Sequence, residues 1–223
     1  MSAEKKIITK GRLAVLIVIA ILLIDQAIKI WVKTSMTLHE SIQITNWFYI
    51  TFIENIGMAF GMQLGSKIVL SLFRVVAIGL LGYYIWLEVE KREKKVRTGY
   101  IVCLSMILAG AAGNLIDCMF YGLIFNNSSE FYQSYFVPFG TGYAPFLMGK
   151  VVDMFYFPLI ETEWPLWMPF VGGDHFVFFS PVFNFADASI SVGVVLLLLF
   201  YREEITQMSL KKKEETIDPI SEE

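Results

Sequence analysis

Four long apolar runs, separated by polar segments, organise the chain. They cover residues 13–32, 68–87, 100–121 and 183–201, and the first opens with an unbroken apolar stretch from Leu13 to Ile24. A bilayer core requires about 20 mostly apolar residues per helix. The pattern therefore predicts an all-α membrane fold, a bundle of four transmembrane helices, in one integral membrane domain that spans residues 1–223.

The first run also has the basic start and apolar middle of a secretory signal peptide. However, it is longer than the apolar part of such a peptide, it carries Asp25 and Lys29, and no small-x-small cleavage site follows it. We therefore interpret 13–32 as a retained helix.

The segments after the first and third runs have different patterns. Between residues 38 and 62, apolar residues alternate with polar ones, which predicts short strands. Residues 122–182 are rich in aromatics and contain six prolines, which break any long helix. Aromatics gather at membrane–water interfaces, so we expect this second segment to lie on the lipid surface.

Composition and charge strengthen the membrane assignment. Hydrophobic residues make up 56% of the chain and charged residues 17%, against about 45–50% and about 25% in soluble domains. This excludes a disordered chain and argues against a soluble enzyme. A net charge of −3 gives no sign of a nucleic-acid partner, and two cysteines build neither a disulfide scaffold nor a zinc site.

The basic residues predict the orientation. Thirteen of the eighteen Lys and Arg residues lie in the N-terminal tail, the 91–97 loop and the C-terminal end. A chain that crosses the membrane four times has these three segments on the same side. Cytoplasmic loops carry the excess of basic residues, so we expect both termini in the cytoplasm and residues 33–67 and 122–182 outside. The charged tail after about residue 206 is expected to be disordered.

Ionisable residues inside a span are unusual, because each raises the free energy of membrane insertion by about 2.5–3.5 kcal/mol. Asp25 and Lys29 are four residues apart on one helix face, so they can form a structural ion pair, or serve as a proton relay or substrate contact. Arg74 can snorkel outward along its stem or pair with an acid from another span.

Two Asn-x-x-Asp pairs lie in the third and fourth runs. Asn114 and Asp117 share a helix face, as do Asn184 and Asp187. Interhelical hydrogen bonding would account for Asn114. A helix N-cap would account for Asn184, but less well for Asp187, which falls inside the expected helix.

Asp153 stands alone in an apolar run, Val151–Phe155, that leads toward the outer membrane face. Taken alone it is more typical of a loop, yet Asp187 is expected at a similar depth. Two neighbouring carboxyls share a proton, so one can activate water while the other polarises a carbonyl, as in aspartic proteases.

A Cys118–His175 pair is formally possible, but no local pattern supports it. Neither a Gly-x-Ser-x-Gly nor a His-Glu-x-x-His motif is present.

Five blocks occur in a specific order on the expected spans, and together they resemble the bacterial lipoprotein signal peptidase family (signal peptidase II). The blocks are Asp25-Gln26-Ala27-Ile28-Lys29, Asn55-Ile56-Gly57-Met58-Ala59-Phe60, Gly113-Asn114-Leu115-Ile116-Asp117, Val151-Val152-Asp153 and Phe183-Asn184-Phe185-Ala186-Asp187. The resemblance runs from about residue 13 to about residue 200.

The resemblance implies an intramembrane aspartic endopeptidase of the bacterial inner membrane, with a small extracytoplasmic β-cradle at 38–62. It implies removal of signal peptides from diacylglyceryl-modified prolipoproteins, by a cut before the lipid-bearing cysteine, without cofactor or metal. Asp153 and Asp187 match the family's catalytic pair. The positions that match its substrate-binding or site-shaping residues are Asp25, Lys29, Asn55, Gly57, Asn114, Asp117, Asn184 and Ala186. Membrane lipid and the inhibitor globomycin are implied partners, and we expect a monomer.

The chain departs from the family pattern in two places. Cys118 stands where the family usually has arginine, and Arg74 or Lys150 could substitute for it. An outward insert fills 123–150, and the stretch from 154 to 186 is also long. Both additions could rim the substrate entrance or lie on the lipid surface.

Two non-enzymatic alternatives remain. A transporter or channel would use carboxylates at the membrane midplane, whereas these acids lie near the outer ends of spans and no inverted repeat is visible. A chaperone-like lipoprotein binder would share the binding features but lack catalysis.

Overall fold

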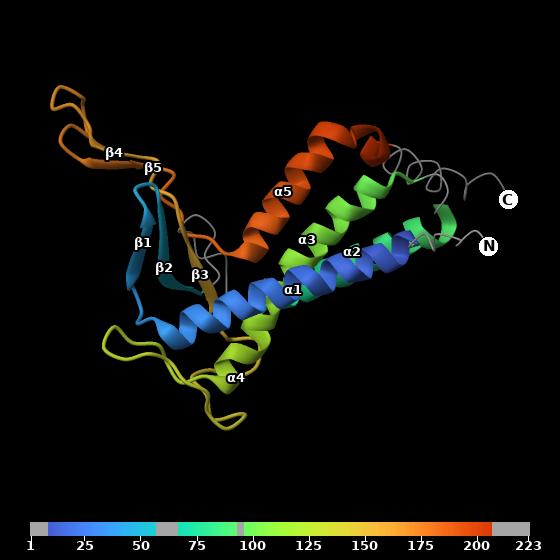
Figure 1. The fold of residues 1–223 in the computed structure, drawn as a ribbon, viewed down its shortest axis with the longest axis horizontal. Coiled ribbons are helices and arrows are strands. Elements are labelled where there is room, and N and C mark those ends of the chain that lie inside the picture. Colours follow the sequence, from blue (N-terminus) through green and yellow to red (C-terminus); the bar gives the residue numbers. More distant parts are fainter. Residues whose placement is uncertain (1–8, 57–66, 93–95, 207–223) are drawn as a thin grey trace, which may run out of the picture.

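The computed structural model describes residues 9–56, 67–92 and 96–206, and consists of a helical bundle with a small sheet at one end (Figure 1). The elements in chain order are α1 (Lys10–Ser35), β1 (Ser41–Thr45), β2 (Phe48–Asn55), α2 (Lys67–Arg92), α3 (Thr98–Ile116), the π-helical turn η1 (Asp117–Tyr121), α4 (Gly122–Ile124), β3 (Val151–Tyr156), β4 (Ile160–Glu163), β5 (His175–Phe178) and α5 (Phe185–Phe200).

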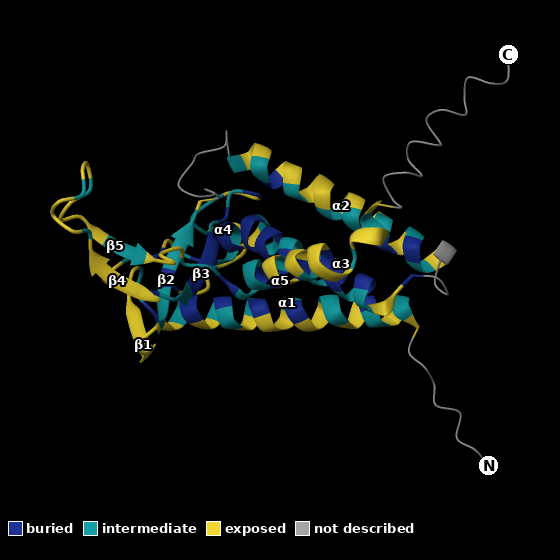
Figure 2. Ribbon diagram, turned by 90° about the horizontal axis from the view of Figure 1, so that it is seen from above, coloured by how far each residue is buried: buried dark blue, intermediate teal, exposed yellow. Residues whose placement is uncertain are grey.

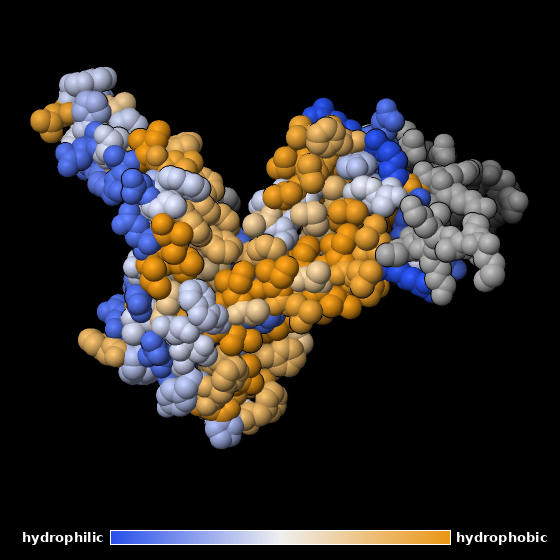
Figure 3. Space-filling model, viewed as in Figure 1, coloured by the Kyte–Doolittle hydropathy of each residue, from blue (hydrophilic) through white to orange (hydrophobic). Residues whose placement is uncertain are grey.

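Among the described residues, three helices are long and apolar enough to cross a membrane. They are Lys10–Ser35, Lys67–Glu90 and Thr98–Ile124. The fourth predicted span appears as α5, which is apolar but has 16 residues, fewer than the roughly 20 that a typical span needs. Apolar side chains cover the outer faces of the bundle (Figure 3), as expected for helices that face lipid.

Helix α3 is the centre of the bundle and packs against α1, α2 and α5. In Figure 2 exposed residues follow α1 and α2 along the two sides of the bundle, and buried residues gather between these helices. Glycines allow this close packing: a Cβ atom at Gly110 would lie 2.3 Å from the carbonyl oxygen of Ala186, and one at Gly113 would lie 2.7 Å from Asp25 Oδ2. The first turn of α5 is thereby brought against α3 and α1.

The sheet at the end of the bundle is antiparallel in the order β1-β2-β3. The predicted strands within 38–62 are confirmed for β1 and β2, and β3 adds to them with Ile53 opposite Asp153 and Asn55 opposite Val151. A hairpin of β4 and β5 projects beyond the sheet (Figure 1). Gly57, the rest of the predicted cradle as far as residue 62, and the charged tail from 207 lie outside the described residues.

The insert between α4 and β3 has no helix, as its turn-rich sequence predicts. It packs instead against the C-terminal end of α1 through a buried apolar cluster. The cluster contains Val32, Met36, Phe52, Tyr121, Phe125, Val152 and Met154. The face of β2 and β3 that carries Phe52, Val152 and Met154 is therefore covered by α1 and the insert.

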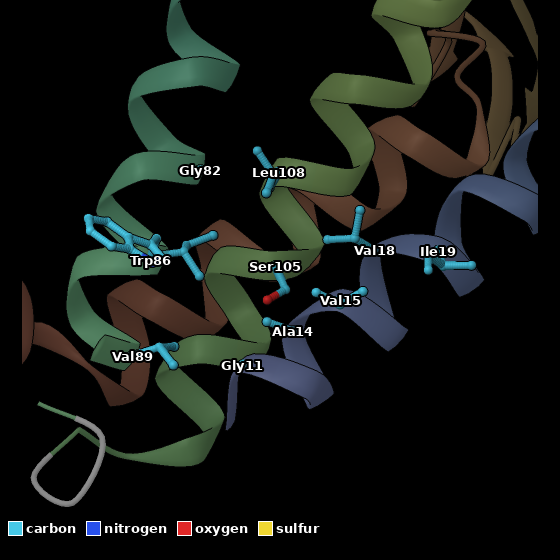
Figure 4. A pocket seen from close by; sticks show the side chains of 11 residues that line it. Gly11, Ala14, Val15, Val18, Ile19, Gly82, Trp86, Val89, Ser105 and Leu108 are labelled. Atoms are coloured by element: carbon cyan, nitrogen blue, oxygen red, sulfur yellow. The ribbon is translucent and has the colours of Figure 1, made fainter. Parts of the chain in front are cut away.

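An apolar cavity of about 420 Å³ lies between α1, α2 and α3, far along the bundle from the sheet (Figure 4). Its walls include Val15, Trp86 and Leu108, and none of its lining residues is ionisable. The hydroxyl of Ser105, which also lines it, donates to the carbonyl of Ile101 at 2.7 Å. The cavity therefore offers no acid or base.

Candidate active site

Asp153 and Asp187 lie at the two ends of one chain of side-chain amides. Asn184 Nδ2 donates to Asp153 Oδ1 at 2.6 Å, and Asn114 Nδ2 donates to Asp187 Oδ1 at 2.7 Å. Asn184 Nδ2 also donates to Asn114 Oδ1 at 3.1 Å, which closes the chain. Strand β3, helix α3 and the start of α5 thus bring together four polar residues that the sequence places in three separate blocks.

The start of α5 fixes Asp187 through a capping box. Asn184 is the N-cap, and its Oδ1 accepts from the backbone N–H of Asp187 at 2.9 Å. Asp187 Oδ2 in turn accepts from the backbone N–H of Asn184 at 3.4 Å. The expectation that a cap would explain Asp187 less well than Asn184 is therefore wrong, because Asp187 is the third helical residue and completes the same cap.

The environment of Asp153 favours its protonated form. Asp153 is buried, with 3% of the residue exposed. Burial, followed by the nearby carboxylate of Asp187, raises the pKa of Asp153 to about 7, while hydrogen bonds from Asn184 and Asn55 and the charge of Lys29 act in the opposite direction. A carboxyl with such a pKa can hold or release a proton at neutral pH.

Lys29 organises the polar groups beneath the acid pair. Its ammonium is fully buried and forms ion pairs with Asp25 at 2.9 Å and with Asp117 at 2.8 Å. It also donates to Asn114 Oδ1 at 2.8 Å. Because Asn114 Oδ1 accepts from Lys29, the NH₂ group of that amide is directed toward Asp187. The predicted Asp25–Lys29 ion pair is confirmed, and Asp117 completes it.

The two acids that pair with Lys29 also hold the backbone beside each member of the pair. Asp25 Oδ1 accepts from the N–H of Ala186 at 3.0 Å, next to Asp187. Asp117 Oδ2 accepts from the N–H of Val152 at 3.3 Å, next to Asp153. One buried ionic cluster therefore sets the positions of both strand β3 and helix α5.

Gln26 is a site residue that the sequence analysis did not single out. Its Nε2 donates to Asp117 Oδ1 at 2.9 Å and to Asp25 Oδ2 at 3.1 Å, and its Oε1 accepts from Tyr121 at 3.1 Å. Its position three residues before Lys29, on the same helix face, was the available signal.

Arg74 meets the thiol of Cys118. Its Nη1 donates to Cys118 Sγ at 3.2 Å, a contact that differs from both a lipid-facing and an acid-paired arginine. Of the two cations considered as substitutes for the family arginine, Arg74 is the one beside Cys118, whereas Lys150 pairs with Glu54 at 2.7 Å.

Within residues 9–56, 67–92 and 96–206, no group of three or more His, Cys, Asp or Glu side chains could hold a metal ion.

Comparison with known proteins places this arrangement in a family. A family model described as signal peptidase (SPase) II matches residues 17–202. The chain belongs to the signal peptidase II family. It is 50% identical over 204 residues to the lipoprotein signal peptidase of Porphyromonas gingivalis, covering 92% of this chain and 89% of that protein. It is 36% identical to that of Amoebophilus asiaticus, covering 89% and 87%.

A solved bacterial membrane enzyme shares the fold of this signal peptidase II family member. The TM-score is 0.57 at 22% identity, covering 87% of this chain and 90% of that structure. Membership confirms the resemblance found in the sequence and identifies a multi-pass bacterial membrane protease that removes signal peptides from prolipoproteins.

Proposed function

We propose that this family member is an aspartic endopeptidase of the plasma membrane, and that Asp153 and Asp187 are its catalytic pair. It cleaves diacylglyceryl-modified prolipoproteins just before the lipid-bearing cysteine. The observation that carries the proposal is the chain of hydrogen bonds through the side-chain amides of Asn184 and Asn114. This chain connects the carboxyl of Asp153 to that of Asp187. Neutral amides suit a pair that shares one proton, because they hold both carboxyls in place and add no net charge beside them.

The shared proton starts on Asp153, whose pKa is raised to about 7 by burial and by Asp187. Ionised Asp187 takes a proton from a water molecule as that water attacks the scissile carbonyl carbon, and Asp153 donates its proton to the carbonyl oxygen. The tetrahedral intermediate then collapses: the C–N bond breaks, the leaving nitrogen takes the proton from Asp187, and the hydroxyl proton returns to Asp153. No cofactor takes part.

The proposed topology has four spans, with α5 as the fourth, both termini in the cytoplasm and the sheet outside. The N-terminal end of α1, the C-terminal end of α2, the N-terminal end of α3 and the C-terminal end of α5 lie at one end of the bundle (Figure 1). Arg97 and Arg202 belong to that end. The sheet and the acid pair lie at the other end, at the depth of the outer headgroups.

The shape of the molecule suits a substrate that arrives within the membrane. In Figure 3 a wide notch, largely apolar, separates the sheet and its hairpin from α5, and the first turn of α5 lies at its floor. A lipid-anchored peptide can enter such a notch sideways from the outer leaflet. The enzyme then acts as a monomer, because one chain supplies both carboxyls.

The direct test is a cleavage assay with the purified full chain. A diacylglyceryl-modified prolipoprotein should be cut before its modified cysteine, the same protein without lipid should be cut far more slowly, and globomycin should inhibit. Tight binding of the lipidated substrate without product would favour the lipoprotein-binding alternative instead.

A further inference from the structure

A second buried group of charged side chains lies close to the acid pair and has no part in the mechanism above. Glu54 of β2 forms ion pairs with Lys33 of α1 at 2.5 Å and with Lys150 of the insert at 2.7 Å. Ser128 of the insert donates to Glu54 Oε1 at 2.7 Å and accepts from Lys33 at 2.8 Å. Glu54 therefore joins three segments that are distant in sequence.

This cluster is built into the interior. The side chain of Glu54 is 3% exposed and that of Lys33 is fully buried, whereas Lys150 keeps 27% of its side chain in contact with solvent. Burial alone would raise the pKa of Glu54, but the charge of Lys33 and hydrogen bonds from Lys150, Lys33 and Ser128 outweigh it and hold that pKa below its ordinary value. Glu54 is thus a permanent anion that needs its two ammonium partners.

Strand geometry connects the cluster to Asp153. Consecutive residues of a strand point to opposite faces of the sheet. Glu54 is directed toward the insert and α1, so Asn55 is directed to the other face, where it hydrogen-bonds Asp153. In the register of β2 and β3, Glu54 lies opposite Val152 and Asn55 opposite Val151.

Lys150 connects the beginning of β3 to Glu54 of β2. It immediately precedes Val151, and its Nζ reaches back across the strand pair to Glu54 Oε2. Its backbone N–H donates to the hydroxyl of Tyr143 at 2.7 Å, and its ammonium lies 5.3 Å from the centre of that ring. The end of β3 is thereby tied both to β2 and to the insert.

We infer that Glu54 and Lys150 are positioning residues, and that their ion pair clamps the ends of β2 and β3 so that Asn55 stays hydrogen-bonded to Asp153. The insert 125–150 supplies this clamp. The inference rests on the proposed role of Asp153, and it gives a chemical task to a segment that the signal peptidase II pattern does not predict.

The clamp makes a prediction that a merely structural contact does not. Asp153 faces Asp187 and Asn184 at the start of α5, Asn55 on β2 and Lys29 on α1. The hydrogen bond from Asn55 favours ionised Asp153, so weakening it raises the pKa of Asp153 further. The mechanism needs protonated Asp153, and activity is lost at high pH as it ionises. Loosening the clamp therefore moves the basic limb of the pH–rate profile upward.

The experiment compares Lys150→Met with wild type on a diacylglyceryl-prolipoprotein. Lys150 is chosen because it is partly exposed and because Glu54 keeps Lys33 as a partner in the variant. We expect kcat to fall by about tenfold through misplacement of Asp153, and the basic limb to move up by about half a pH unit. Lys150→Arg, which retains the ion pair, should behave as wild type.

Glu130→Gln is the matched control, because it removes an exposed charge of the same insert whose ion-pair partner is His39. Amide hydrogen exchange at Asn55 and Val152 should be faster in Lys150→Met, and Lys150→Gln carries the same test if the Met variant does not fold. Unchanged profiles and exchange in a Lys150 variant, with an active wild type, would overturn the clamp. An inactive wild type with faster exchange in the variant would count against the proposed function and leave the clamp standing.

Discussion

At the scale of single residues, burial of Asp153 beside a second carboxyl has a cost in stability that depends on pH. The pKa of Asp153 rises from 3.8 to about 7, chiefly through burial. Between these two values the folded protein binds the proton more tightly than the unfolded chain, so the stability falls as the pH rises through this window. The same burial that prepares the acid for catalysis therefore weakens the fold at neutral pH.

Asp153→Asn should remove this penalty. The difference in Tm between this variant and wild type should increase in favour of the variant from pH 5 to pH 8, measured by thermal unfolding in detergent. Asp174→Asn, in the connection between β4 and β5, is the control and should show no such trend. A Tm difference that stays constant with pH would contradict a raised pKa for Asp153.

Lys29 gives a second prediction at this scale. Lys29→Met leaves the carboxylates of Asp25 and Asp117 buried without their ammonium partner, and breaking such a pair costs about 3–5 kcal/mol. We expect a large drop in Tm together with loss of cleavage, because both backbone anchors beside the catalytic pair loosen. A variant with wild-type Tm would show that the ionic cluster does not hold the fold.

The proposed catalytic pair was a candidate from sequence alone, since Asp153 and Asp187 are acids in apolar surroundings and lie in family blocks. The Arg74–Cys118 contact was not, because it depends on how α2 is rotated about its axis against η1. The clamp residues also gave no local signal, because Glu54 lies 21 residues from its partner Lys33 and 96 residues from its partner Lys150.

At the scale of elements, apolar runs located the helices but not their ends. Helix α1 continues past residue 32 because Lys33 is neutralised inside the protein by Glu54, which a count of apolar residues cannot detect. Helix α5 begins after the N-cap Asn184 and stops before Tyr201, so it is shorter than its apolar run. The pairing of β3 with β2 joins segments nearly a hundred residues apart, which no local sequence pattern predicts.

The turn η1 bears on the reactivity of Cys118. Its thiol is 1% exposed and accepts a hydrogen bond from Arg74, so it behaves as a structural side chain. Cys118→Ser keeps an acceptor for Arg74 and should retain most of the cleavage activity, with Cys103→Ser as the control. Inactivation of wild type by a small thiol alkylator, prevented by Cys118→Ser, would count against this view.

At the scale of the whole molecule, the orientation in the membrane decides which substrates can reach the acids. In a background with both native cysteines replaced by Ser, Phe139→Cys places a thiol on the insert, at a position that is 73% exposed. A membrane-impermeant thiol reagent should label it from outside intact spheroplasts. Labelling only after the membrane is opened would overturn a topology with cytoplasmic termini.

The central claim is that two carboxyls, one from the sheet and one from the bundle, perform the cleavage together. The most direct measurement is the cleavage of a diacylglyceryl-prolipoprotein by Asp153→Asn and by Asp187→Asn, each purified in folded form, with Asp174→Asn as the control. Each of the two variants should lose at least about a thousandfold in kcat, since neither acid alone can both activate water and protonate the carbonyl, while the control keeps wild-type activity. Activity within a few-fold of wild type in either variant would contradict catalysis by the acid pair.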